Sequence, residues 1–279
     1  MAGLQAERRS FIIGPASTGR LADSARAAAL SMGVLALGLA LWQAASGRLS
    51  YAGGGLPGPW ETVRSAWELV SSPFYDFGPN DKGIGWQLVY SMRRLLSAYL
   101  GTALAAVAVG TALGLNPVLW KALNPYIQVF KTVSPLAWMP LFLYTVRESE
   151  RAVFLVVFIS TLWPILTNTA FGVSSIDREY LHVAAILELP WHRRLLRVVL
   201  PAAAPSILVG LRVAVGTAWV ALVAAEMLVG GNGLGYFIWN EWNNLKLTSV
   251  LTGILVIGLV GYALDAALAA AQRAVRYSR

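Results

Sequence analysis

The sequence predicts an all-α polytopic membrane protein with about six transmembrane helices. Of its 279 residues, 57% are hydrophobic and only 13% are charged, and the mean hydropathy is +0.59. Soluble domains are far more polar than this. A helix needs roughly 20 apolar residues to cross a bilayer, and several stretches reach that length. Cysteine is absent, which excludes disulfides, thiolate metal sites and a cysteine nucleophile.

We expect a single transmembrane domain at 27–270, between a cytoplasmic amino-terminal segment, 1–26, and a cytoplasmic tail, 271–279. The six spans are expected at 27–45, 95–115, about 126–144, 152–172, 205–229 and 247–270. A cleaved signal peptide is the alternative for the first span, because QAAS at its end resembles a cleavage site. The leader and the apolar run are both long, which favours a retained helix.

Three features are expected to shape the bundle. Pro135 and Pro140 must bend the third span and free backbone carbonyls that only protein or a water-filled cavity can satisfy, so this helix is expected to face a polar pathway. Gly110 and Gly114 allow close contact with a neighbouring helix. Ahead of the second span, segment 59–70 places tryptophans on one helical face, which is typical of an interfacial helix at the outer surface.

The distribution of basic residues predicts both termini inside. The amino-terminal segment and the segment 177–201 each hold four arginines and the tail holds three, whereas residues 47–87 hold three basic and four acidic residues. Arg93 and Arg94 oppose this arrangement and are interpreted as interfacial anchors. The formal charge of +8 is dispersed among short segments, so membrane lipid explains it better than nucleic acid does.

The segment 177–201 is too polar to cross a bilayer and is strongly patterned. Its first half is expected to form a helix, Asp177–Leu189, with a serine at 174–175 as its cap and Pro190 as its stop. A second short helix, Trp191–Val199, is expected to follow and to gather three arginines.

This helix–corner–helix resembles the cytoplasmic coupling loop of ABC importer permeases. The family pattern is Glu-Ala-Ala, a glycine, and then Ile-x-Leu-Pro, and residues 198–201 and Ala184 fit it. The pattern's glutamate, first alanine and glycine are replaced here by His182, Val183 and Glu188. The segments GPNDKG, SPLAWMPLFLY and FIWNEWNN resemble the nitrate, cyanate and bicarbonate branch of that family.

The resemblance implies the type I importer permease fold: a helical bundle that dimerises around a central path, with no catalytic residue of its own. Its implied partners are two ATPase subunits, which would bind ATP and Mg²⁺, a second permease copy, and an extracytoplasmic substrate-binding protein in a bacterial inner membrane. The substrate implied first is nitrate or nitrite, then cyanate, bicarbonate or a sulfonate. The implied coupling residues are Asp177, Tyr180, Leu181, His182, Ala184, Ala185, Leu187, Glu188, Pro190 and Pro201.

A small anion would pass along hydroxyls and amides in preference to strongly charged pockets. The candidates for such a lining are Thr132, Ser134, Thr161, Thr167, Asn168 and Thr217. Charges inside spans are expensive and are usually paired or functional. Lys131 and Arg212 are interpreted as snorkelling near helix ends, with Asp265 able to pair with one of them. Glu226 is expected to have a structural or gating role, and Arg212 is a second candidate for such a role.

Other functions find little support in the sequence. It contains no G-x-x-x-x-G-K-[ST] motif, so ATP must be hydrolysed elsewhere. His182 and His192 do not have the spacing of a zinc site, and we predict no bound metal or cofactor. The alternative from another class is an ATP-independent secondary transporter or channel. Such a protein commonly shows inverted repeats or buried coupling-ion carboxylates and would not need the segment 177–201.

Overall fold

The computed structural model describes residues 18–48, 50–51, 54–78 and 81–276. Its contacts divide the chain into two units, Met1–Glu61 and Thr62–Arg279. The first 17 residues of the predicted amino-terminal segment and the last three of the predicted tail, Arg279 among them, lie outside the described residues. The predicted domain limits are therefore not tested.

The first unit contains one long helix, α1 (Thr18–Arg48), of which Arg26–Arg48 is long and apolar enough to cross a membrane. After it come two very short antiparallel strands, β1 (Ser50–Tyr51) and β2 (Gly54–Gly55), and the start of α2 (Pro59–Ser71). The helix α2 forms where the sequence predicts the interfacial helix, and Trp60 and Trp67 are both exposed on it.

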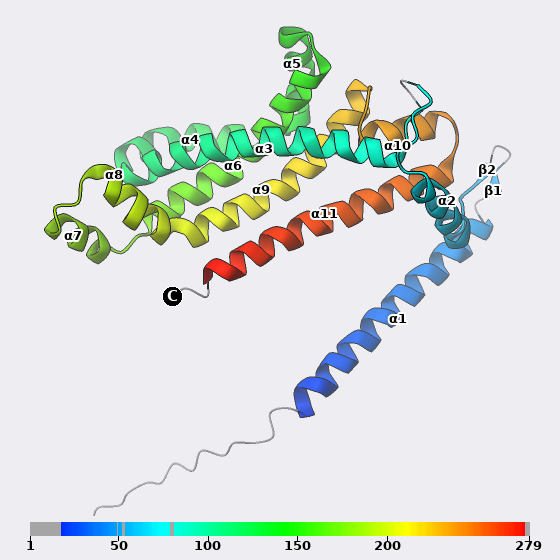
Figure 1. Cartoon of the computed structure of the whole chain (residues 1–279), viewed down its shortest axis with the longest axis horizontal. Helices are drawn as coiled ribbons and strands as arrows, with labels where there is room; N and C mark the ends of the chain where they lie inside the picture. The colour runs from blue at the N-terminus through cyan, green and yellow to red at the C-terminus, as the bar shows by residue number, and fades with distance from the viewer. Residues whose placement is uncertain (1–17, 49, 52–53, 79–80, 277–279) are drawn as a thin grey trace, which may run out of the picture. The chain divides into compact units, whose positions relative to one another are not determined.

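The second unit is a helical bundle built on α3 (Ile84–Leu115), α6 (Ser149–Ser174) and α9 (Leu200–Val229) (Figure 1). The helices α10 (Leu234–Asn243) and α11 (Leu247–Arg276) pack against α9. Alanines and valines fill the core between α3, α6 and α9. A Cβ at Gly110 would come within 2.8 Å of the Leu166 carbonyl, and one at Gly114 within 2.7 Å of the Ala170 carbonyl. These two glycines let the backbones of α3 and α6 approach closely.

In the part of the chain that the structure describes, five helices are long and apolar enough to cross a membrane, or up to six if one bent pair counts as a span. This confirms the predicted all-α fold with about six spans. Most helices extend beyond the predicted limits, because apolar residues mark only the portion suited to hydrocarbon, and polar residues continue the helix on either side.

The third predicted span is broken, where the sequence predicted only a bend. Helix α4 (Pro117–Thr132) begins at Pro117, with the Asn116 side chain accepting from two backbone N–H groups at 3.1 Å. A 3₁₀ turn, η1 (Pro135–Trp138), and α5 (Met139–Val146) follow at 88° to α4. The residue before a proline avoids helical dihedrals, and Ser134 accordingly has an extended ψ of 129°.

The segment predicted as helix–corner–helix forms α7 (Arg178–Ile186), α8 (Trp191–Arg194) and a π-helical turn, η2 (Leu195–Val199). Three details of the prediction are wrong. The hydroxyls of Ser174 and Ser175 do not cap α7 but bond to the Phe171 carbonyl at the end of α6. Helix α7 ends three residues earlier than expected. The second short helix runs without a break into α9, so the helix that contains the fifth span starts at Trp191, ahead of the predicted span limit at Pro205.

The π turn has a local cause. Pro201 has no N–H to offer the carbonyl four residues back, and its ring crowds that carbonyl. The Leu200 N–H bonds instead to the Leu195 carbonyl, five residues back. The helix widens over one turn and then continues through Pro205.

The backbone conformation at the end of α7 explains why the family pattern has a glycine where this chain has Glu188. The Leu189 N–H bonds to the Ala184 carbonyl at 3.2 Å and the Glu188 N–H to the Ala185 carbonyl at 3.0 Å, which is the Schellman arrangement. Glu188 has φ of 48°, the left-handed conformation that glycine adopts most easily. The backbone of this turn is therefore kept although the side chain is replaced.

Replacing Glu188 with glycine should stabilise the turn by up to about 1 kcal/mol, because a side chain in the left-handed region costs about that much. The apparent melting temperature of the detergent-solubilised protein should rise. The matched control, Glu188→Ala, removes the same charge but keeps a Cβ. If both variants gain equally, the charge and not the backbone conformation limits stability here.

Candidate functional site

A cavity of about 670 Å³ lies between the break after α4, α6 and α9. Four of the six predicted pathway residues line it: Ser134, Thr167, Asn168 and Thr217. The two others point elsewhere. Thr161 is fully buried and donates to the Val157 carbonyl, and Thr132 is exposed and donates to the Val129 carbonyl.

Several polar groups of the cavity serve the backbone around Pro164. A proline in α6 leaves the Ser160 carbonyl without its helical partner, and the Thr217 hydroxyl from α9 donates to it at 3.3 Å. The Thr167 hydroxyl donates to the Trp163 carbonyl at 2.7 Å, and the Asn168 amide donates to the Pro164 carbonyl at 2.8 Å. The Thr217 hydroxyl thus replaces the helical bond that Pro164 removes, whereas Thr167 and Asn168 each add a second donor to a carbonyl of their own helix.

Other lining groups remain available to an occupant. Lys131 and Ser134 line the cavity, and their side chains have no hydrogen-bond partner among the described residues. The indole N–H of Trp163, another lining residue, is buried and without a partner in the same part of the chain. Ammonium and indole groups are donors only, so the cavity suits an occupant that accepts hydrogen bonds. Lys131 is therefore not only the snorkelling residue predicted from the sequence, and Trp163 is a lining residue that the sequence did not indicate.

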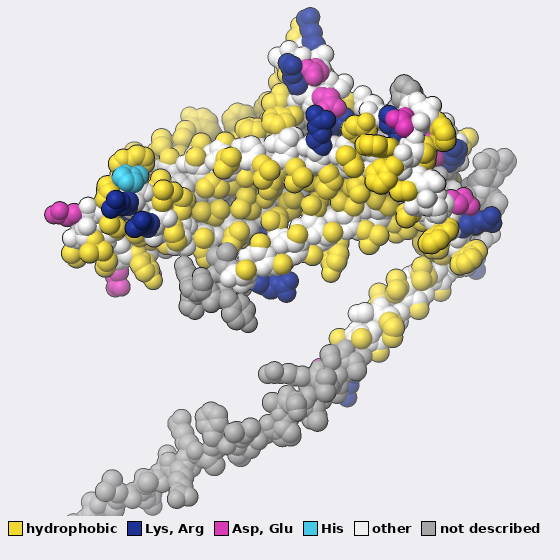
Figure 2. All heavy atoms as spheres, viewed as in Figure 1, with side chains coloured by type: hydrophobic (Ala, Val, Ile, Leu, Met, Phe, Trp, Pro, Cys, Tyr) yellow, Lys and Arg dark blue, Asp and Glu magenta, His cyan; other side chains and the backbone are white. Residues whose placement is uncertain are grey.

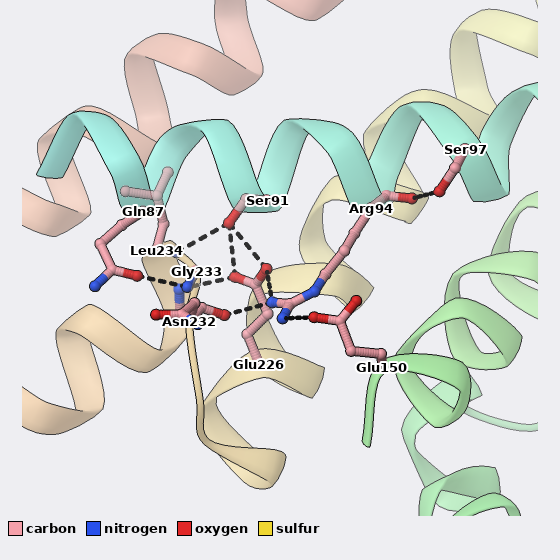
Figure 3. Close-up of polar contacts among 10 residues, drawn as sticks. Gln87, Ser91, Arg94, Ser97, Glu150, Glu226, Asn232, Gly233 and Leu234 are labelled. Carbon is pink, nitrogen blue, oxygen red and sulfur yellow. Dashed lines mark hydrogen bonds and ion pairs between the residues drawn. The ribbon is translucent and has the colours of Figure 1, made fainter. Parts of the chain in front are cut away.

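A second polar site surrounds Glu226, which is completely buried (0% exposed) near the end of α9 (Figure 3). The Ser91 hydroxyl contacts both carboxylate oxygens at 2.8 Å and 2.9 Å, and Arg94 bonds to one of them at 3.1 Å. Another guanidinium nitrogen of Arg94 contacts Glu150 at the start of α6, at 2.6 Å. The same arginine also donates to the Asn232 carbonyl.

The first turn of α10 completes this cluster. The backbone N–H groups of Gly233, Leu234 and Gly235 donate to the side chains of Gln87, Ser91 and Glu226. A new helix has unsatisfied N–H groups at its start, and here neighbouring helices supply the acceptors. A Cβ at Gly233 would lie 2.3 Å from the Glu226 carboxylate, so this glycine-rich turn leaves room for the carboxylate.

Sequence reasoning singled out Glu226 but missed its partners. Ser91 and Arg94 lie three residues apart on one helical face, and Arg94 contradicted the distribution of the other basic residues. That contradiction was the available signal, because a charge in the wrong place often has an internal partner. Arg94 is an internal ion-pair residue and not the interfacial anchor that was predicted.

A further ion pair joins α9 to α11. Arg212 donates to both carboxylate oxygens of Asp265 at 2.7 Å. Of the two expected partners for Asp265, the structure therefore selects Arg212. A bidentate pair of this kind fixes the relative position of two helices more strictly than a single contact does.

The helix α7 presents an apolar surface without a partner in the described chain. Tyr180, Val183, Ile186 and Leu187 are exposed, with Leu187 at 64%. Ala184 is buried at 2%, and Leu181 packs into a small cluster with Val199 and Ala203. Of the predicted coupling residues, Asp177, His182, Ala185, Glu188, Pro190 and Pro201 are also exposed.

Glu226→Gln should lower the free energy of unfolding by about 3 kcal/mol, because it leaves a buried arginine with only one of its two anionic partners. Glu148→Gln is the control. Its ion pair with Arg151 joins two half-exposed or exposed side chains, so its loss should cost about 1 kcal/mol or less. Thermal unfolding in detergent compares the two. Equal losses of unfolding free energy in the two variants would mean that the buried ion pair of Glu226 stabilises the fold no more than the exposed pair of Glu148 does.

Known proteins resemble this chain over most of its length. A model of the family "binding-protein-dependent transport system inner membrane component" matches residues 101–277. The chain is 42% identical to the nitrate import permease protein NrtB of Leptolyngbya laminosa over 208 residues, 75% of each chain. It is 39% identical to the bicarbonate transport system permease protein CmpB of Synechococcus elongatus, over 78% of this chain and 80% of that one.

The fold also resembles that of a solved transporter. A chain of the inward-facing MetNI methionine ABC transporter superposes with a TM-score of 0.56 at 17% identity, covering 69% of this chain and 97% of that one. The family match, the identity to relatives and the shared fold agree with the resemblance seen in the sequence. The chain belongs to the family of binding-protein-dependent transport system inner membrane components, and it is a multi-pass permease subunit of an ABC importer.

Proposed function

We propose that this permease imports nitrate, using the cavity between α4, α6 and α9 as part of its path. The observation that carries this proposal is that the free groups of the cavity, Lys131, Ser134 and the indole N–H of Trp163, can all donate hydrogen bonds. Nitrate only accepts hydrogen bonds. The relatives named nitrate import permease support the same substrate.

Bicarbonate is the second candidate, because relatives named bicarbonate transport permeases are nearly as similar. Bicarbonate carries a hydroxyl that must itself donate, and Lys131 and the Trp163 indole cannot accept from it, so bicarbonate would depend on a serine hydroxyl such as that of Ser134 as its acceptor. Family membership favours an ATP-driven importer over the ATP-independent transporter or channel considered from sequence.

We further propose that partner subunits supply the energy. Two ATPase subunits would bind ATP and Mg²⁺ and receive the exposed face of α7, while this chain would catalyse no reaction. A second permease copy would close the open side of the cavity, and a substrate-binding protein would deliver the anion from outside. ATP-driven closure of the ATPases would then rock the bundles between inward- and outward-facing states.

The proposed orientation in a bacterial inner membrane puts both termini and α7 in the cytoplasm. Support comes from α11, whose carboxyl end points toward the end of the second unit that holds α7 (Figure 1). Within this scheme, Glu226 and its partners would hold α3, α9 and α10 together at the outer end and contribute to gating or assembly. The Arg212–Asp265 pair would have a structural role between α9 and α11.

Lys131→Gln should raise the KM for nitrate about tenfold in proteoliposomes that contain the full importer, because it removes one charge-assisted contact worth about 1.5 kcal/mol or more. Lys131→Arg keeps the charge and should retain most of the uptake. Lys121→Gln, on the same helix but outside the cavity, is the control. Unchanged nitrate kinetics in Lys131→Gln would remove Lys131 from the path.

Leu187→Glu should reduce ATP-dependent uptake at least about tenfold while the protein stays folded, because a charge inside an apolar contact costs more than about 1.4 kcal/mol. Ala184 is unsuitable for this test, since it is buried and its replacement would disturb α7 itself. Ala274→Glu places the same charge on an exposed part of α11 and serves as the control. Normal uptake by Leu187→Glu would argue against docking through this face.

A further inference from the structure

A second, larger cavity of about 980 Å³ forms a groove along α3 and across the α8–η2–α9 junction. Its walls come from apolar residues such as Leu104 and Ala108 on α3 and Leu195 on η2. Leu104 is 78% exposed, so the groove opens to the outside of the bundle. None of the residues that line the candidate pathway lines this groove.

The walls offer almost nothing to a polar occupant. Among the described residues, Thr111 is the one hydroxyl-bearing residue in the lining, and its hydroxyl donates to the Val107 carbonyl of its own helix at 2.7 Å. Since α3 is an apolar span, the groove runs through the depth of the bilayer that hydrocarbon fills. An acyl chain is therefore the occupant that the walls suit.

One end of the groove is basic, in contrast to its apolar walls. Arg194 is the single charged residue in the lining, it is half-buried, and its side chain has no partner within the described ranges. Arg193 and Arg197 are exposed beside it, and Trp191 lies in the same lining. Figure 2 shows basic side chains gathered at this end of the bundle, next to a broad hydrophobic surface. Basic residues with a tryptophan at the end of a span are typical of contacts with anionic headgroups.

We propose that this groove binds one anionic phospholipid, with the phosphate at Arg194 and an acyl chain along α3. A second permease copy fits the groove less well. No carboxylate of the described residues lines it, so a symmetric contact through this surface would bury Arg194 without an anion. A phospholipid supplies both the hydrocarbon and the negative charge. The bound lipid would contact the segment that leads from α7 into α9.

The test is native mass spectrometry of the full importer taken from nanodiscs that contain phosphatidylglycerol and phosphatidylcholine. The wild-type complex should retain phosphatidylglycerol after delipidation. Arg194→Gln should weaken retention roughly fivefold, the effect of about one basic residue near an anionic surface. Arg194→Lys should restore most of it. Arg273→Gln, which removes an exposed arginine from α11, should change nothing.

A second variant tests the groove itself. Ala108→Phe fills the space beside Leu104 and leaves Arg194 intact, so it should abolish retention although the headgroup contact remains. Retention that survives Ala108→Phe, or that is equal in wild type and Arg194→Gln, would overturn the proposal. The chain has no cysteine, so Leu104→Cys provides a unique thiol in each copy. Disulfide cross-linking of two copies through this thiol would show that a second permease covers the groove, and would also overturn it.

Discussion

The buried carboxylate of Glu226 sets the arrangement of one whole end of the bundle. A charge at 0% exposure among apolar helices is tolerable only if donors surround it. Those donors come from α3 and from the first turn of α10, while Arg94 also draws in the start of α6. The need to satisfy one charge therefore positions four helices at once. In the turn before α10, the lack of a side chain at Gly233 leaves space for the carboxylate.

Prolines impose a second constraint, at the centre of the bundle. Each proline within a span leaves a carbonyl unpaired, and in hydrocarbon the protein itself must satisfy it. Around Pro164 the unpaired carbonyl is that of Ser160, and the hydroxyl of Thr217 donates to it. The break at Pro135 has the further effect of opening a cavity whose free groups are Lys131, Ser134 and Trp163. Some polar groups of this site therefore bond to the backbone, and others remain available to an occupant.

Much of this could be predicted from sequence, because the length of apolar runs places the spans and short motifs carry the family. Four of the six candidate pathway residues line the cavity between α4, α6 and α9. Arg94 was misassigned, since its partner Glu226 is 132 residues away and no local pattern records which helices pack together. The sharp break at Pro135 could not be predicted either. A proline indicates that the helix is irregular, but the packing of the neighbouring helices determines the angle between its two parts. The unusual backbone at Glu188 was signalled only by the glycine of the family pattern.

The continuity of the helix from Trp191 to Val229 has a mechanical consequence. With 39 residues rising 1.5 Å each, it is a rod of roughly 58 Å. One of its ends adjoins α7 and the other carries Glu226, so a tilt imposed at the first end displaces the second in the opposite direction across the bundle. The π turn at Leu195–Val199 is a place near the α7 end where its hydrogen bonding is irregular. Stiffness at that single turn would set how much of a movement at α7 reaches the far side of the membrane.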